Sequence, residues 1–254
     1  MKKTETPRVT PPSTALNVSP VSPMAKSGGT ATGKVRTSGR KIAEITFWMT
    51  RATPTEAIRA ATGQPFEPKL VKLHKGEHKT PEYLAMNPSG QVPVLVVDGK
   101  PLTQIVAICD FLDRRVPQAG LLPTEVWERA QAMSQLAWMN NTVHPTFTHV
   151  FRASDFAESE AAQGEVRRVA AARYRGYLER IQNLVAGASP YWFGARVSCH
   201  DAYAFTLLRW GGYAGIDPKS LPAYNAYIER VLAAPPVAAA LERERIKLDT
   251  YKAA

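Results

Sequence analysis

The spacing of apolar residues changes character about halfway along the chain. Between residues 45 and 112 the apolar positions fall in short runs separated by turn-forming residues, which is typical of strands joined by short helices. This pattern predicts strands and helices in alternation. The strands cover 45–49, 66–73, 92–97 and 100–102, the helices cover 54–61 and 81–86, and a third helix opens at Gln104.

Local signals support these boundaries. Asp98 and Gly99 predict a two-residue hairpin turn, because both central positions need a positive φ that these residue types tolerate. Residues 53–56 have the form of a capping box with proline at the first helical position. Pro93 lies in an apolar strand and cannot donate to a sheet, so its bond with Val92 is either trans at a strand start or cis. The complete order of elements is that of a thioredoxin-like α/β layer.

The second half of the chain is helical throughout. After a linker with two prolines and a glycine, apolar residues at three-to-four spacing predict helices over 124–143, 163–186, 201–214, 220–233 and 236–250. Ser198 and Asp201 form a capping box, so Asp201 is expected to be a structural cap. The helix that follows is apolar nearly all round and therefore belongs at the centre of a bundle.

The first 43 residues differ in composition from the rest. They hold eight basic residues against one acidic residue, Glu5, and so carry most of the formal net charge of +10. They are rich in Pro, Ser, Thr and Gly and poor in large apolar residues, which predicts disorder. A basic tail can contact nucleic acid, but this one lacks the aromatic residues that stack on bases, so we do not expect a nucleic-acid partner. We expect a disordered basic extension over 1–43, a thioredoxin-like domain over 44–117 and an all-helical domain over 124–254.

Composition narrows the protein class further. With 44% hydrophobic and 21% charged residues, the chain has the balance of a soluble globular protein. No apolar run approaches the roughly 20 residues that span a bilayer, so we expect no membrane partner. Two cysteines, Cys109 and Cys199, are too few for a disulfide framework and fit a reducing cytoplasm. His74 and His78 are four residues apart, but the sequence offers no third ligand, so we expect no metal.

The motifs around the third predicted strand carry a family resemblance. The chain reads NPSGQVPVL from Asn87, then the hairpin, then LTQIVAICDFL, and much further on RVSCHDAYAFTLLRW. In combination these segments resemble the glutathione S-transferase family, nearest to its bacterial beta-like classes, over roughly residues 44–246. The resemblance implies an α/β thioredoxin-like domain followed by an all-α helical bundle, glutathione as co-substrate, and a homodimer.

The resemblance also implies a glutathione site made largely of main chain. In this family the proline at the position of Pro93 is cis, and the backbone of the preceding residue, here Val92, pairs with the cysteinyl part of glutathione. Gln104 and the backbone N–H of Ile105 are expected at the γ-glutamyl end. Many members have Ser where this chain has Ile105, so one hydroxyl hydrogen bond is missing. Gln91 is expected either to face glutathione or to be an ordinary surface glutamine.

The expected thiolate-stabilising position departs from the family pattern. The pKa of a thiol is ordinarily about 8.5, so conjugation at neutral pH needs a group that favours the thiolate. The family places a Tyr, Ser or Cys in the loop after the first strand, and that loop here reads MTRATP. Thr53 has two possible roles, a plain N-cap or the donor of a hydroxyl hydrogen bond to the thiolate. Arg51 is either a solvated loop residue or the source of a positive charge beside the sulfur.

The helical half supplies two further candidates. The segment WMNNTVHP resembles the beta-like segment whose Asn and His border the active site, which places Asn140 and His144 there. Without that context, packing would be the better interpretation of a lone histidine. Because Pro145 follows His144 within a helical stretch, we expect a kink or break at this point.

We therefore expect a cytoplasmic glutathione transferase that acts in detoxification by attacking small electrophiles with the glutathione thiolate. The alternative is a non-catalytic binding or regulatory protein of the same fold. The altered first loop and Ile105 favour the alternative, and the retained Val92-Pro93 pair, Gln104, Asn140 and His144 oppose it.

Overall fold

The computed structural model describes residues 45–49, 58, 60–246 and 248–252. The chain divides into two units, 1–41 and 42–254, and every described residue belongs to the second. The basic extension therefore lies outside the described residues, as does the start of the first predicted helix. Of that helix, residue 58 and residues 60–62 are described, and they are helical.

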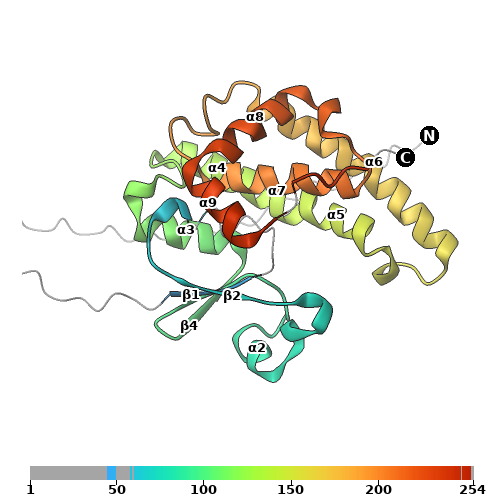
Figure 1. Cartoon of the computed structure of the whole chain (residues 1–254), viewed down its shortest axis with the longest axis horizontal. Helices are drawn as coiled ribbons and strands as arrows, with labels where there is room; N and C mark the ends of the chain where they lie inside the picture. The colour runs from blue at the N-terminus through green and yellow to red at the C-terminus, as the bar shows by residue number, and fades with distance from the viewer. Residues whose placement is uncertain (1–44, 50–57, 59, 247, 253–254) are drawn as a thin grey trace, which may run out of the picture. The chain divides into compact units, whose positions relative to one another are not determined.

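The thioredoxin-like region is built on a four-stranded sheet (Figure 1). Its strands are β1 (Ile45–Met49), β2 (Glu67–Leu70), β3 (Val94–Val97) and β4 (Lys100–Thr103), in the order β2-β1-β3-β4. β1 runs parallel to β2 and antiparallel to β3, and β3 pairs with β4. The hairpin turn is confirmed, because Asp98 and Gly99 both have positive φ, at 49° and 77°.

β2 is shorter than the strand predicted over 66–73. The chain leaves the sheet after Leu70 and enters a 3-10 turn at Leu73–Lys75. The N–H of Lys72 donates to Glu77 Oε2 at 2.7 Å, so a side-chain carboxylate in the following loop takes the place of a strand partner. Sequence spacing alone does not reveal this competition.

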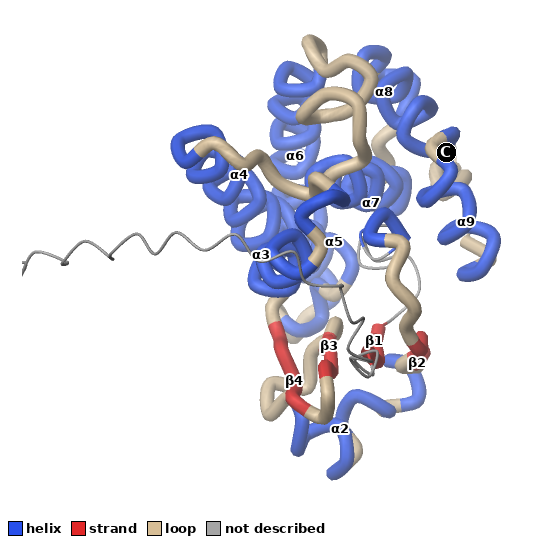
Figure 2. The backbone as a smooth tube through the Cα atoms, turned by 90° about the vertical axis from the view of Figure 1, so that its left-hand side faces the viewer, coloured by secondary structure: helices blue, strands red, loops and turns tan. Residues whose placement is uncertain are grey.

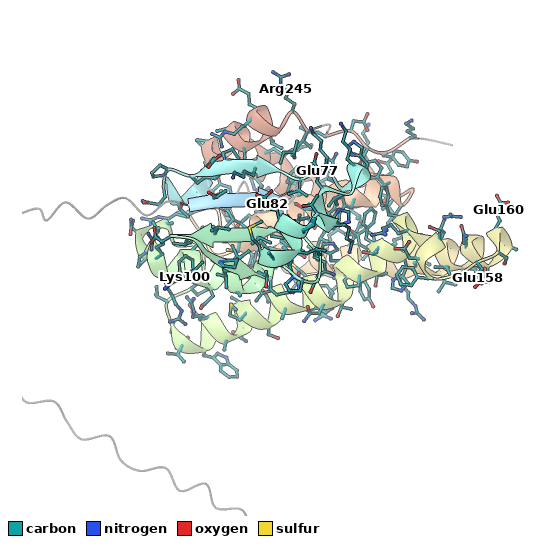
Figure 3. The ribbon with its side chains drawn as sticks, turned by 90° about the horizontal axis from the view of Figure 1, so that it is seen from below. Glu77, Glu82, Lys100, Glu158, Glu160 and Arg245 are labelled. Carbon is teal, nitrogen blue, oxygen red and sulfur yellow. The ribbon has the colours of Figure 1, made fainter. Side chains whose placement is uncertain are left out.

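Helices cover the two faces of the sheet differently, as Figure 2 shows. On one face α2 (Pro81–Met86) contributes Tyr83 to a small core with Val71 and Val94. Figure 3 views the chain from this side, with Glu77 and Glu82 in front of the sheet and Glu160 far from it. On the other face α3 (Ile105–Arg115) buries its apolar stripe in a large core that continues into the helical region. The two halves of the described chain therefore share one hydrophobic core.

The helical region places one helix at its centre, as predicted. Its elements are α4 (Val126–Trp138), α5 (His144–Phe151), α6 (Glu160–Val185), α7 (Cys199–Tyr213), α8 (Pro222–Ala233) and α9 (Pro235–Glu244). α7 is buried along nearly its whole length. α9 ends before the predicted residue 250, because Arg245 adopts a left-handed conformation with φ 51° that ends the helix.

The capping box at the start of α7 is confirmed. The Ser198 hydroxyl accepts from the N–H of Asp201, and the Asp201 carboxylate accepts from the Ser198 N–H at 2.7 Å. Asp201 is fully buried, and its other oxygen accepts from the Trp192 N–H at 3.0 Å and from the Tyr227 hydroxyl. A buried carboxylate needs such donors, since its burial without them is very costly. The role of Asp201 is thus structural.

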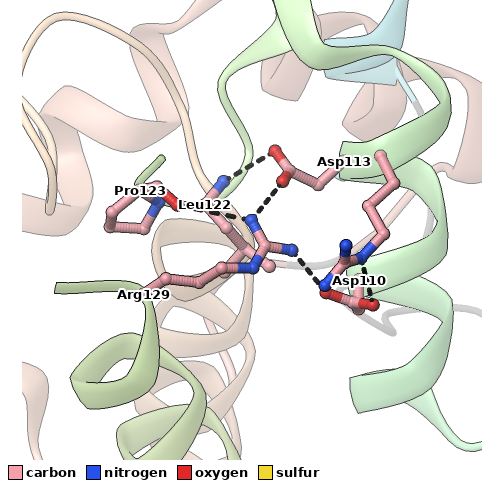
Figure 4. A network of polar contacts seen from close by, with 6 residues as sticks. Asp110, Asp113, Leu122, Pro123 and Arg129 are labelled. Atoms are coloured by element: carbon pink, nitrogen blue, oxygen red, sulfur yellow. Dashed lines mark hydrogen bonds and ion pairs between the residues drawn. The ribbon is translucent and has the colours of Figure 1, made fainter. Parts of the chain in front are cut away.

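A second polar network joins α3 to α4 (Figure 4). The Arg129 guanidinium binds the Asp113 carboxylate at 2.6 Å and also binds Asp110. Asp113 is 6% exposed and accepts from the Leu122 N–H at 3.1 Å as well. The network therefore ties the linker and the first helix of the bundle to the last helix of the thioredoxin-like region.

Arg129→Ala should destabilise the protein by roughly 3 kcal/mol, because it leaves the buried Asp113 carboxylate without its cation. Chemical denaturation monitored by circular dichroism measures this. The matched control is Arg168→Ala. Arg168 also makes two hydrogen bonds to a carboxylate, that of Glu165, but this pair is exposed to solvent. The control should leave stability unchanged. Equal effects of the two substitutions would contradict the structural role of the network.

A buried histidine at the start of α7 makes stability depend on pH. His200 is fully buried, and its Nε2 lies 2.9 Å from the Ala132 carbonyl oxygen, so Nε2–H donates. Nδ1 finds no partner among the described residues. Burial lowers the pKa of His200 to about 4, although the Ala132 carbonyl opposes this shift. The unfolded chain has a histidine pKa of about 6.5, so it binds protons more readily than the folded chain between these values.

Stability should therefore fall as the pH drops from about 6.5 toward 4. The contribution of His200 is about 2–3 kcal/mol by pH ~4.5, with full stability retained above the unfolded pKa. Urea unfolding at several pH values measures this loss, and His200→Gln, which cannot titrate in this range, should show a correspondingly smaller one. If stability falls equally with pH in the two proteins, His200 has the same pKa in the folded and unfolded states, and the prediction is wrong.

Candidate functional site

The turn before β3 is held rigidly by two side chains. The Tyr83 hydroxyl donates to the Gln91 carbonyl oxygen at 2.6 Å, and Asn87 Nδ2 donates to the same oxygen at 2.7 Å. The Asn87 side-chain oxygen in turn accepts from the Ser89 N–H at 3.2 Å. Burial raises the pKa of Tyr83 to about 12, so its hydroxyl stays a donor at neutral pH. These bonds leave the Gln91 side chain exposed.

Position 90 of this turn favours glycine. Its φ is +59°, and an added Cβ would lie 2.7 Å from Lys79 Nζ and 3.1 Å from the His78 carbonyl oxygen. The positive φ therefore favours glycine, and the nearby His78 carbonyl oxygen leaves little room for a side chain.

The backbone of Val92 makes no hydrogen bond to any of the residues that the structure describes. The Val92–Pro93 peptide bond is cis, as the resemblance implied, and β3 begins only at Val94. No hydrogen bond joins the Val92 N–H or C=O to another described residue. Val92 and Pro93 thus lie just before β3, and among the described residues the main-chain groups of Val92 have no hydrogen-bond partner.

The start of α3 lies beside Val92 and Pro93. Val94 pairs with Thr103 in the hairpin register, which brings Pro93 next to Gln104. Gln104 is the N-cap residue with φ 68°, and its side chain makes no capping bond. The first N–H groups of α3 find no acceptor among the described residues, and they form the positive end of the helix. The Ile105 side chain is buried, so only its backbone N–H can face a ligand.

Asn140 and His144 come together in the helical region, with a partner that sequence reasoning missed. His144 Nδ1 lies 2.9 Å from the Tyr203 hydroxyl, which lies 3.2 Å from Asn140 Oδ1. The His144 ring also meets Trp210 edge-on at 4.6 Å between centroids. Tyr203 is buried on α7, where the sequence showed only a core aromatic residue. Burial lowers the pKa of His144 to about 4, so its ring is neutral at pH 7.

The predicted break before Pro145 takes the form of a π-helical turn at Met139–Val143. The His144 N–H donates to the Met139 carbonyl oxygen, five residues back. Pro145 has no N–H for the Asn141 carbonyl, which favours this wider turn. The turn carries Asn140 and the helix after it begins at His144.

The remaining predicted site residues, Thr53 and Arg51, lie outside the described residues. The described residues therefore assemble two groups of candidates. One, around Val92 and Gln104, belongs to the thioredoxin-like region, and the other, around His144, belongs to the helical region. No hydrogen bond joins the two groups among the described residues.

Other kinds of site were sought within the same described part of the chain. It contains no group of three or more His, Cys, Asp and Glu residues placed to hold a metal ion. None of its helices is long and apolar enough to cross a membrane. Two surface cavities of about 480 and 640 Å³ are lined by residues other than the candidates above.

A thioredoxin-like α/β layer joined to a helical bundle defines the class of fold, and the comparisons identify the family. Residues 45–114 match the model of the glutathione S-transferase N-terminal domain. The chain is 34% identical over 182 residues to glutathione S-transferase GST-4.5 of Xanthomonas campestris pv. campestris, covering 71% of this chain and 87% of that relative.

Solved structures agree with the sequence comparison. A glutathione transferase homolog from Sulfitobacter, with bound glutathione, superposes with a TM-score of 0.72 at 26% identity, over 80% of this chain and 99% of that one. A bacterial beta class glutathione S-transferase from Sphingomonas chungbukensis superposes with a TM-score of 0.67 at 27% identity, over 78% and 98%. The chain belongs to the glutathione S-transferase family, and the predicted fold is confirmed.

Proposed function

We propose that this chain is a glutathione transferase that joins the glutathione sulfur to small electrophiles. The observation that carries the proposal is the hairpin register, which brings Val92 beside the N-terminus of α3; the main-chain groups of both make no hydrogen bond to the described residues. An extended peptide pairs with the first, and a carboxylate binds at the second. The similarity to a transferase structure with bound glutathione supports the same assignment.

The tripeptide would be held chiefly by main chain. The Val92 N–H and C=O pair with its cysteinyl unit, and the N–H of Ile105 binds the γ-glutamyl carboxylate at the positive end of α3. Gln91 and Gln104, both exposed, hold the two ends of the molecule. Asn140 and His144 border it from the helical region.

The chemical step is attack by sulfur on an electrophilic carbon. The thiol loses its proton, the thiolate forms the new sulfur–carbon bond, and a leaving group departs with its electron pair where the electrophile carries one. Thr53 would donate its hydroxyl to the thiolate, and Arg51 would supply positive charge. Phe147 and Trp210, stacked at 4.9 Å, offer an aromatic wall for the electrophile.

Two further features of the family are proposed for this chain. Cys109 and Cys199 are both buried free thiols, which suits a reducing cytoplasm and a role in detoxification there.

A homodimer would use the outer face of α3 and the start of α4, where a cavity of about 480 Å³ is lined by Leu102, Phe111 and Arg114, among others. Val126, at the first position of α4, is 81% exposed there.

Calorimetric titration should show glutathione binding to the wild-type protein in the micromolar to millimolar range. Gln104→Ala should weaken it roughly tenfold, because a hydrogen bond to a charged group is lost. Gln118→Ala, which removes an exposed glutamine from the 3-10 turn Pro117–Ala119 in the linker, is the matched control and should bind normally. Thr53→Ala should raise the pKa of the bound thiol if Thr53 is the donor. Absence of binding at several millimolar would overturn the transferase proposal in favour of a non-catalytic protein of this fold.

Val126→Glu should shift the protein from dimer to monomer in analytical ultracentrifugation, because it places a carboxylate in the proposed interface. A carboxylate at the first turn of a helix favours the helix, so the fold should persist. The control is Ala161→Glu, an exposed site near the start of α6. A dimer that survives Val126→Glu would place the interface elsewhere, and a monomeric wild-type protein would exclude the homodimer.

A further inference from the structure

Asn140, Tyr203 and His144 form a hydrogen-bonded chain whose proton positions can be worked out. Asn140 Nδ2 donates to Asn141 Oδ1 at 2.8 Å, so it is Asn140 Oδ1 that faces the Tyr203 hydroxyl. A carbonyl oxygen can only accept. The single hydroxyl proton of Tyr203 therefore points to Asn140, and burial, which raises the pKa of Tyr203 well above its usual value, keeps that proton in place.

The Tyr203 oxygen is then left as an acceptor for His144. Its separation from His144 Nδ1 is 2.9 Å, which is a hydrogen-bond distance. Because the hydroxyl proton is already committed to Asn140, the proton in this second bond must come from the imidazole. His144 consequently carries its ring proton on Nδ1, and Nε2 carries the lone pair.

A ring in this state has a restricted chemistry. Burial lowers the pKa of His144 to about 4, so Nε2 does not carry a proton at neutral pH. A nitrogen lone pair cannot stabilise a thiolate, since both groups are hydrogen-bond acceptors. A base this weak also does not take the proton of a thiol, whose pKa is about 8.5. Nε2 can accept a hydrogen bond from an N–H group.

We propose that Tyr203 is a positioning residue which, with Asn140, holds His144 as the Nδ1–H tautomer, so that Nε2 accepts a hydrogen bond from an N–H group of bound glutathione. The inference rests on the proposed function, because it places His144 at the tripeptide. It separates the two halves of the site by role: the helical region binds the peptide, and the thiolate is stabilised elsewhere.

The tautomer is measured on the ligand-free protein by 15N chemical shifts of histidine-labelled samples, which distinguish a ring N–H from a lone pair. The chain has five histidines, so His144→Gln identifies the signal. His200 supplies an internal reference of the opposite kind, since its Nε2–H donates to the Ala132 carbonyl. Wild-type His144 should show a protonated Nδ1 and an unprotonated Nε2.

Two substitutions should move the ring proton to Nε2. Tyr203→Phe removes the acceptor of the Nδ1 proton, and Asn140→Ala frees the Tyr203 hydroxyl to donate to Nδ1 instead. The second variant keeps the test available if the first does not fold. Tyr224→Phe is the matched control, because it also removes one buried hydroxyl bond, to the Ala204 carbonyl at 2.7 Å, without touching His144. The control should keep the wild-type tautomer.

Function is measured with glutathione and chlorodinitrobenzene as the electrophile. Tyr203→Phe should raise KM for glutathione roughly tenfold, the cost of about one hydrogen bond, and leave kcat and the pKa of the bound thiol unchanged. The thiol pKa is read from the ultraviolet absorbance of the thiolate. Tyr224→Phe should change none of these values.

The outcomes separate this inference from the proposed function. A protonated Nε2 in the wild-type protein would overturn the inference whether or not glutathione binds. A raised thiol pKa or a reduced kcat in Tyr203→Phe would also overturn it, because His144 would then act on the sulfur. A wild-type protein with the expected tautomer and no affinity for glutathione would refute the proposed function, and with it the role of Nε2 in binding.

Discussion

The buried carboxylate of Asp201 is the constraint on which the helical region depends. A carboxylate taken out of water is tolerated only where donors surround it, and here the donors come from three separate segments. The Ser198 backbone begins α7, the Trp192 N–H belongs to the loop before it, and the Tyr227 hydroxyl comes from α8. Satisfying one charge therefore fixes where α7 starts and what packs against it. Because Tyr203 and Trp210 follow on α7, the surroundings of His144 are set by the same cap.

The link between the two groups of candidate residues also depends on a buried carboxylate. Asp113 closes α3 with a buried carboxylate, and its donors are the Leu122 N–H in the linker and the Arg129 guanidinium on α4. The start of α3 bears N–H groups that find no acceptor in the described part of the chain, and α4 leads through its π-helical turn to Asn140. The Asp113 network thus sets the position of one candidate group relative to the other, and a shared hydrophobic core supports it.

What the sequence could predict was local. The Asp98-Gly99 turn, the capping box of α7 and the buried character of that helix depend on neighbouring residues, and all three are confirmed. The length of β2 was wrong because Glu77 competes for the Lys72 N–H, and the length of α9 was wrong because Arg245 takes a left-handed conformation.

The candidate site was predictable only in part, for a related reason. Gln91, Val92 and Gln104 lie within one hairpin and its flanks, so a motif can reveal them. The partner of His144 is 59 residues away on another helix, and nothing in the spacing around Tyr203 marks it out from the other core aromatic residues. The roles of Thr53 and Arg51 stay predictions, because both lie outside the described residues.

The proposed site is made largely of main chain, and such a site tolerates the departures of this chain from the family pattern. The Val92 backbone and the first N–H groups of α3 are present whatever the side chains are, provided that the turn and the helix start are kept. Those are kept by Gly90, by the Tyr83 and Asn87 bonds to the Gln91 carbonyl, and by the hairpin register. In the proposed site, the buried side chain of Ile105 in place of a serine removes one hydrogen bond and leaves the main-chain geometry of the turn and helix start in place. Thiolate stabilisation depends instead on a particular side chain. Of the proposed functions of the site, it is therefore the one that the altered loop after the first strand affects most.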